Sequence, residues 1–157
     1  MADIIKSLAQ KNYRTLLEAV EANNWICGQD DAALKIDYGV NGDYFKMKFI
    51  IKVEAEKQLV ILNSELPCKF PREKSGIAAM VICTANYALA DGRFDFNLDN
   101  GSISFKMTEN YRGSLLSKEA FMYLLNYSVW AIDKFYKPIN DVITGKRTPK
   151  DMSLIQI

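Results

Sequence analysis

The stretch GRFDFNLDNGSISFKMT, residues 92–108, decides the fold class of this chain, because apolar and polar side chains alternate on both sides of one turn signal. Asn100 and Gly101 both tolerate positive φ and predict a two-residue hairpin turn. Counting outward from that turn pairs Leu98 with Ile103, Phe96 with Phe105 and Phe94 with Met107, all on one face. The stretch therefore predicts a half-buried antiparallel hairpin, whose apolar side needs a covering layer of helices.

A second hairpin is predicted earlier in the chain from the same turn chemistry. Asn41 and Gly42 form the turn signal, and the same count pairs Tyr38 with Phe45, Ile36 with Met47 and Leu34 with Phe49. The second strand continues to Val53, and a turn near residues 55–57 returns the chain through residues 58–63. Residues 34–63 are thus expected to form a three-stranded meander, preceded by a loop over residues 25–31.

Three helices are expected to flank these strands. Residues 3–23 and 77–90 show helical spacing of apolar side chains, and Ser117 is a suitable N-cap for a long last helix. Pro67 interrupts the strand pattern, and Pro138 is expected to begin or kink a short segment over residues 139–144. The sequence predicts one α+β domain over residues 1–145 and a flexible C-terminal tail over residues 146–157.

Composition and charge favour no special partner. The chain has 157 residues with 20 basic and 19 acidic side chains, a formal net charge of +1, so it indicates neither nucleic acid nor an anionic membrane surface as a partner. The beginning of the chain lacks the apolar core of a signal peptide or membrane anchor. Cys27, Cys68 and Cys83 are widely spaced without a CxxC motif, which indicates free thiols in a reducing compartment. A cytoplasmic location is expected.

The polar residues of the chain form no recognised catalytic or metal-binding motif. The chain has no histidine, no GxGxxG and no GxxxxGK[ST] motif, and none of its cysteines stands in a nucleophile motif. Asp95, Asn97 and Asp99 imitate the start of a calcium loop, but Asn100 and Lys106 stand where such a loop needs glycine and glutamate. We therefore expect a protein that is not an enzyme and that has no cofactor and no metal ion.

A first candidate binding surface comes from residues 59–62, which are apolar at every position. If Val53 pairs with Val60 on the core side, then Leu59, Ile61 and the adjacent Ile50 point to the opposite face. One interpretation, which we favour, is that the long side chains of lysine and glutamate neighbours cover them. The other is an apolar platform for a partner polypeptide.

A second candidate surface is the helix over residues 77–90, which is apolar nearly all round. Such a helix is covered on more than one side. Burial within the monomer and burial in a homodimer leave the same pattern, and we favour a homodimer. The candidate dimer residues are Ile77, Met80, Val81 and Thr84.

The second half of the chain resembles the bacterial YbjN-like family of sensory transduction regulators. The resemblance rests on ANYALADGRFDFNLDNGSISF over residues 85–105, on the helix that opens at Ser117, and on YKPINDVITG over residues 136–145. It implies a fold like that of type III secretion chaperones, with a five-stranded antiparallel sheet in the order 1-2-3-5-4 packed against helices. It implies no reaction and no catalytic residue.

The residues and the resemblance together predict a non-enzymatic, chaperone-like or regulatory module that binds protein, either a client or a second copy of itself. Two alternatives stay open. One is a dedicated type III secretion chaperone, although those proteins are usually acidic. The other is a small-molecule-binding protein with a pocket between the last helix and the sheet.

Overall fold

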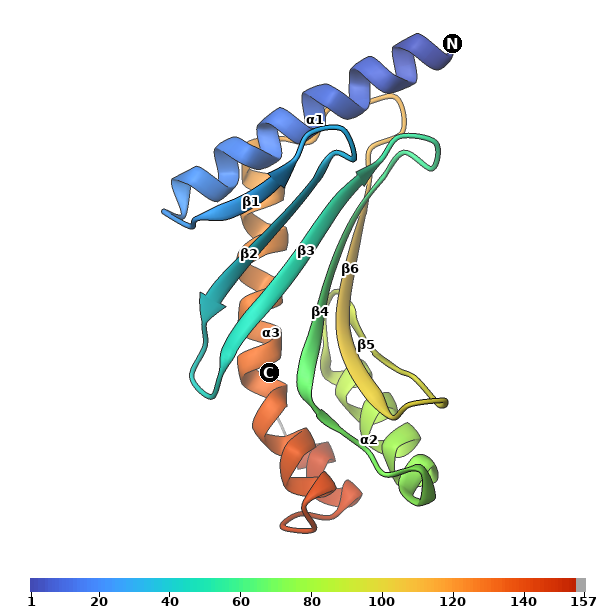
Figure 1. Cartoon of the computed structure of the whole chain (residues 1–157). Helices are drawn as coiled ribbons and strands as arrows, with labels where there is room; N and C mark the ends of the chain where they lie inside the picture. The colour runs from blue at the N-terminus through green and yellow to red at the C-terminus, as the bar shows by residue number, and fades with distance from the viewer. Residues whose placement is uncertain (155–157) are drawn as a thin grey trace.

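The computed structural model describes residues 1–154 and consists of one antiparallel sheet with helices behind it (Figure 1). The strands are β1 (Cys27–Asp30), β2 (Lys35–Asn41), β3 (Lys46–Glu54), β4 (Leu59–Lys69), β5 (Arg93–Phe96) and β6 (Ser102–Asn110). The helices are α1 (Ala2–Ala22), α2 (Ser75–Ala88) and α3 (Lys118–Ile143), with short 3-10 helices η1 (Arg72–Lys74) and η2 (Pro149–Leu154). The predicted α+β class with an antiparallel sheet and three main helices is confirmed.

The sheet has six strands in the order β1-β2-β3-β4-β6-β5, so the predicted five strands in the order 1-2-3-5-4 are wrong. The additional strand is β1, which lies in the expected loop and pairs with β2 at the sheet edge. Its residues show no alternation of apolar and polar side chains, and Gly28, Gln29 and Asp30 are all exposed. An edge strand of this composition carries no hydrophobic signal, which is why sequence patterns do not find it.

The register of the β2–β3 hairpin differs from the prediction by four residues. Tyr38 pairs with Phe49 and Ile36 with Ile51, because the turn is centred two residues further along the chain than Asn41-Gly42. The Gly42 N–H donates to the Phe45 carbonyl over 3.0 Å and closes the turn around residues 43–44.

Contacts with α3 hold this turn in place. The carboxylate of Asp133 accepts from the Asp43 N–H over 2.9 Å, and the Phe45 ring lies 4.6 Å from that of Tyr136. A Cβ on Gly42 would lie 2.5 Å from the same Asp133 carboxylate, so a larger residue there would have to displace it. Tertiary contacts therefore override the local turn preference.

The register of the β5–β6 hairpin differs from the prediction by two residues. Phe94 pairs with Phe105 and Phe96 with Ile103, and residues 98–101 form the loop. Gly101 has a φ of 73°, and a Cβ there would collide with the Phe70 carbonyl oxygen. The loop is held to this residue by the Phe70 N–H, which donates to the Gly101 carbonyl over 3.0 Å. Both register errors are even numbers of residues, so the predicted distribution of side chains between the two faces holds within the strands. The prediction for Leu98 is wrong, because this residue lies in the loop and is exposed instead of facing Ile103.

The helices cover one face of the sheet and leave the other without a helical layer (Figure 1). α3 begins at Ser117, whose side chain accepts from the Ala120 N–H over 3.1 Å, as a capping residue does. The predicted separate segment over residues 139–144 is wrong, because α3 continues through Pro138 to Ile143. β4 likewise continues past Pro67, although its pairing with β6 is irregular between Glu65 and Lys69.

The stretch expected as a tail is partly folded. η2 contacts α2, and Met152 is buried with 1% of its surface exposed. The Lys146 and Arg147 N–H groups donate to the Asp141 carbonyl at the end of α3 and turn the chain back toward the domain. The packed domain thus extends to η2, and residues 155–157 of the predicted tail lie outside the described residues.

Candidate functional site

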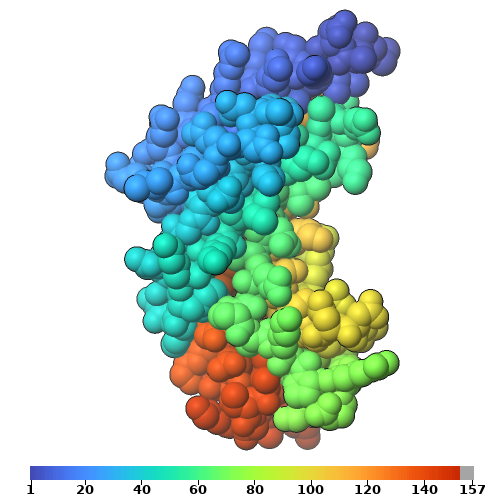
Figure 2. All heavy atoms as spheres, in the orientation of Figure 1, coloured from blue at the N-terminus to red at the C-terminus, as the bar shows by residue number. Residues whose placement is uncertain are grey.

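The uncovered side of the sheet, here called the open face, is the front surface of the strands in Figures 1 and 2. One row of outward-facing residues crosses all six strands, and its members are Gly28, Asp37, Ile50, Asn63, Lys106 and Arg93. Ile50 is the apolar member of this row and has 49% of its surface exposed. Single exposed apolar side chains are common on protein surfaces, so Ile50 is informative only through the residues that surround it.

The structure places all three predicted platform residues on the open face. The pairing of Val53 with Val60 is as predicted, so Leu59 and Ile61 lie on the same side as Ile50. Leu59 and Ile61 are half-buried, in contrast to the more exposed Ile50. Whether the three residues bind a partner stays a prediction.

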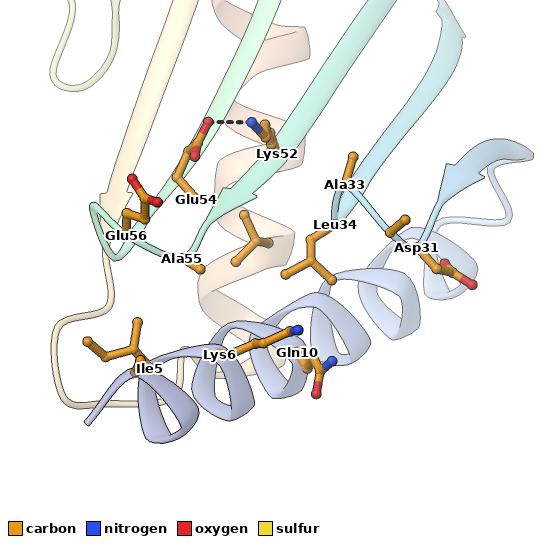
Figure 3. Close-up of a pocket in the computed structure, with 13 residues that line it drawn as sticks. Ile5, Lys6, Gln10, Asp31, Ala33, Leu34, Lys52, Glu54, Ala55 and Glu56 are labelled. Carbon is orange, nitrogen blue, oxygen red and sulfur yellow. Dashed lines mark ion pairs between the residues drawn. The ribbon is translucent and has the colours of Figure 1, made fainter.

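An ion pair accounts for the partial burial of Leu59 and Ile61. Lys52 is the cross-strand neighbour of Ile61, and Glu54 is that of Leu59. The Lys52 ammonium lies 2.6 Å from the Glu54 carboxylate (Figure 3). By strand register, the two paired side chains therefore stand next to both apolar residues. Their stems can cover apolar surface in the way the first interpretation requires, and Ile50 remains as the exposed centre of the face.

Beside Ile50, a hollow of about 600 Å³ lies over β1, β2 and β3. Gly28 and Gly39 are in its lining. A Cβ on Gly28 would lie 2.7 Å from the Asp37 carboxylate, and one on Gly39 would lie 2.7 Å from the Lys46 side chain. The two glycines therefore leave room for charged side chains that fold across the strands. This hollow depends on β1 and was not predicted.

The hollow has an excess of positive charge. Lys35, Lys46 and Lys48 line it, with Asp37 as its acidic residue. Among the described residues, none of these three lysines takes part in an ion pair.

Elsewhere on the open face some charged side chains are paired with each other, whereas Asp30, Glu65 and Lys69 take part in no ion pair among the described residues. Asp95 accepts from Arg93 over 2.9 Å and lies 3.1 Å from Lys106, and the Lys52–Glu54 pair neutralises the middle of the face. The lining of the hollow thus has three lysines against one aspartate.

The predicted dimer residues on α2 are not all on one surface. Met80 is 57% exposed and Ile77 is 37% exposed, whereas Val81 is buried inside the monomer. The prediction that Val81 is an accessible contact residue is therefore wrong. Thr84 is half-buried, and its hydroxyl donates to the Met80 carbonyl over 2.8 Å. Tyr87 extends the outward side of α2, which carries no charged residue over Ser75–Ala88.

A second hollow of about 750 Å³ lies between α1 and the ends of the strands (Figure 3). Ile5 and Lys6 of α1 face Leu34 and Ala55 across it. Leu34 has a φ of 49°, which is rare for a residue with a branched side chain. This hollow lies beside the first helix, whereas the predicted small-molecule pocket was between the last helix and the sheet.

The described residues show few chemically unusual groups. Within residues 1–154, no set of three or more cysteine, aspartate and glutamate side chains is placed to hold a metal ion, and none of the helices has the length and apolar character to cross a membrane. Burial raises the pKa of the Cys68 thiol to about 12, which leaves that thiol protonated and unreactive near neutral pH. Burial, and then the hydrogen bond to Asp31, raise the pKa of Tyr13.

The architecture defines a two-layer α+β protein in which helices cover one face of a six-stranded antiparallel sheet. It is similar to the crystal structure of YbjN from E. coli, which is described as a candidate transcription regulator, with a TM-score of 0.56 and 11% sequence identity over 85% of this chain and 92% of that chain. The predicted YbjN-like fold is thereby confirmed, and at this identity the likeness concerns the fold alone. No family model and no curated protein matches the sequence.

Proposed function

We propose that this protein is a non-enzymatic module that binds another polypeptide on the open face of its sheet, at Ile50 and the hollow beside it. The observation that carries the proposal is that this face has no covering layer and still presents a half-exposed isoleucine at the centre of its residue row. Burial of apolar area contributes about 25 cal/mol per Å², so an exposed isoleucine on a rigid sheet is a favourable anchor for a partner.

The outward side chains favour a polypeptide over a nucleic acid. Proteins that bind single strands without sequence preference stack bases on aromatic side chains. Of the described strands, none has an aromatic residue at an outward position, because the outward residues of β3 are Lys46, Lys48, Ile50, Lys52 and Glu54 and the other strands are similar. Aliphatic and charged groups suit a peptide segment better.

Selection from a random peptide display library tests this function. The selected peptides should bind the wild type, should bind the Ile50→Lys variant at least about tenfold more weakly, since a buried apolar contact is replaced by a charge, and should bind Met80→Lys normally. Met80 is the matched control because it is a similarly exposed apolar residue on α2, away from the open face. Peptides that bind all three proteins equally would show that the open face is not the site.

A homodimer through α2 is a second proposal, supported by the uncharged and partly exposed outward side of this helix. Two copies can bring such surfaces together without like-charge repulsion. The double variant Ile77→Lys/Met80→Lys should then have half the mass of the wild type in light scattering, while Ile50→Lys should keep the wild-type mass. A wild type that is monomeric at every concentration would contradict the dimer.

Small-molecule binding is the third proposal, and the hollow beside α1 supports it, because ligand pockets are typically about 300–1,000 Å³ in volume. Ala32 lies on its rim and is exposed, so Ala32→Trp should fill the hollow without disturbing the core. A metabolite that raises the melting temperature of the wild type and not of Ala32→Trp would support this function.

A dedicated secretion chaperone remains the narrowest form of the polypeptide-binding proposal. It would have its effector gene beside its own, so the neighbouring genes are the direct test. A regulatory role, like that described for the structural neighbour, would use the same surface to bind a protein partner in the cytoplasm.

A further inference from the structure

Building on the proposed function, we infer that the polypeptide bound on the open face is acidic at the hollow, with two acidic side chains at alternate positions followed by an apolar one. The acidic part of this motif concerns the three lysines of the hollow, and its apolar part concerns Ile50. The motif identifies the chemical class of partner that this surface fits.

The spacing along β3 supports this pattern. The outward side of β3 presents Lys46, Lys48 and Ile50 in turn, at every second position of the strand. Alternate residues of a strand lie about 6.6–6.8 Å apart on one face. An extended partner segment has the same repeat, so acidic groups at positions i and i+2 can face the two lysines while an apolar group at i+4 meets Ile50.

The charge distribution supports the same partner. Lys35, Lys46 and Lys48 have no ion pair among the described residues, and the lining of the hollow sets the one carboxylate of Asp37 against them. That carboxylate lies over Gly28 at the edge of the sheet. Asp30 lies across from Lys35 at the sheet edge, so Lys46 and Lys48 are the lysines with the least acidic surroundings. A bound carboxylate would thus meet uncompensated ammonium groups, whereas on the β5–β6 side the lysine and arginine are already paired with Asp95.

Three labelled peptides test the inference by fluorescence anisotropy. The acidic probe has the core Glu-Thr-Glu-Thr-Leu, the neutral probe has Gln-Thr-Gln-Thr-Leu, and the third has Glu-Thr-Glu-Thr-Ser. In low salt we expect the acidic probe to bind about tenfold more tightly than the neutral one, as two exposed charge contacts allow. The advantage should shrink at high salt because exposed charges are screened, and the serine probe should bind more weakly than the acidic probe.

Protein variants assign the effect to the hollow. Lys46→Gln/Lys48→Gln should abolish the preference for the acidic probe, and Lys11→Gln/Lys118→Gln should keep it, since these two lysines are exposed on the helices. All four lysines are exposed, so both variants should melt like the wild type.

The outcomes separate this inference from the proposed function. Equal binding of the acidic and neutral probes, each lost in Ile50→Lys, would overturn the acidic partner and leave polypeptide binding intact. A preference that Lys11→Gln/Lys118→Gln abolishes would also overturn it. Tighter binding of single-stranded oligouridine than of every peptide would overturn it in favour of nucleic acid. The proposed function itself would be contradicted if neither these probes nor the display library yielded a peptide whose binding is lost in Ile50→Lys.

Discussion

The two faces of the sheet can be compared along neighbouring rows that differ by one residue in each strand. The covered row consists of Ile36, Ile51, Leu62 and Met107, all of which are buried. The open row beside it consists of Asp37, Ile50, Asn63 and Lys106. Ile50 and Ile51 are thus adjacent in the chain and identical in chemistry. The exposed fraction of the residue surface is 49% for Ile50 and 0% for Ile51. The comparison shows that stability and binding can be altered separately on this sheet.

The largest expected effect is the contrast between these two isoleucines. Ile51→Ala removes fully buried methyl groups and should lower the free energy of unfolding by about 2–5 kcal/mol. Ile50→Ala should lower it by less than about 1 kcal/mol, because the side chain is half in water already. Urea unfolding of both variants measures the difference. Equal losses would mean that the open face is covered in the folded protein.

The second contrast concerns an asparagine that joins the covering helices to the sheet. The Asn86 side chain donates to the Phe94 carbonyl over 2.9 Å and accepts from the Phe94 N–H over 2.7 Å, which fixes α2 to the edge strand β5. Asn86→Ala leaves both backbone groups without a partner and should cost about 1–3 kcal/mol. Asn126→Ala on the exposed side of α3 is the control and should be nearly neutral. A neutral Asn86→Ala would show that α2 is held by its apolar contacts alone.

The third contrast is between two thiols. Cys68 is on the covered face and Cys83 is exposed on α2. In variants that keep one cysteine each, a thiol reagent at pH 8 should modify Cys83 at once and Cys68 only as the protein unfolds. Immediate modification of Cys68 would contradict its burial.

The same burial predicts a pH dependence of stability. Burial raises the pKa of Cys68 to about 12 in the folded protein, whereas an unfolded thiol titrates near about 8.5. Because the folded pKa is the higher one, the contribution of this group to stability is complete below about pH 8 and is lost as the pH rises toward 12. Between pH 8 and 9.5, the melting temperature of Cys68→Ala should fall less than that of the wild type.

The smallest expected effect is on the open face. The Lys52–Glu54 ion pair is partly exposed, so Lys52→Gln should change the free energy of unfolding by no more than about 0.5 kcal/mol. The substitution should affect peptide binding more than stability, because removal of the long ammonium side chain uncovers Ile61. The variant should bind apolar peptides at least as well as the wild type, and weaker binding would contradict the covering role of Lys52.

Much of the fold could be predicted from the sequence because the alternation of side chains assigns each residue to a face. A change of two or four residues in register keeps that assignment, so the covered face was predicted correctly while both hairpin registers were wrong. The registers depend on contacts from distant residues, namely Asp133 at the β2–β3 turn and Phe70 at the β5–β6 loop. Local turn preferences contain no information about such contacts.

The candidate site was predicted only in its apolar part. The continuous apolar residues 59–62 predicted apolar side chains on the outer face as well as the inner one, and the meander register placed Ile50 beside them. The hollow required β1, whose four residues have no strand pattern, and its charge required three lysines that are scattered over residues 35–48. A near-neutral whole chain gave no indication of this local excess.

The position of α3 has a consequence for the synthesis of the protein. Every strand leaves the ribosome before α3, which supplies Phe121, Ile132 and Phe135 to the core. At about 5–20 residues per second, translation of the 26 residues of α3 takes about 1–5 s. During that interval the apolar face of the nascent sheet lacks this helix, so completion of the fold waits for translation of α3. The growing chain is then most exposed to aggregation and to ribosome-associated chaperones.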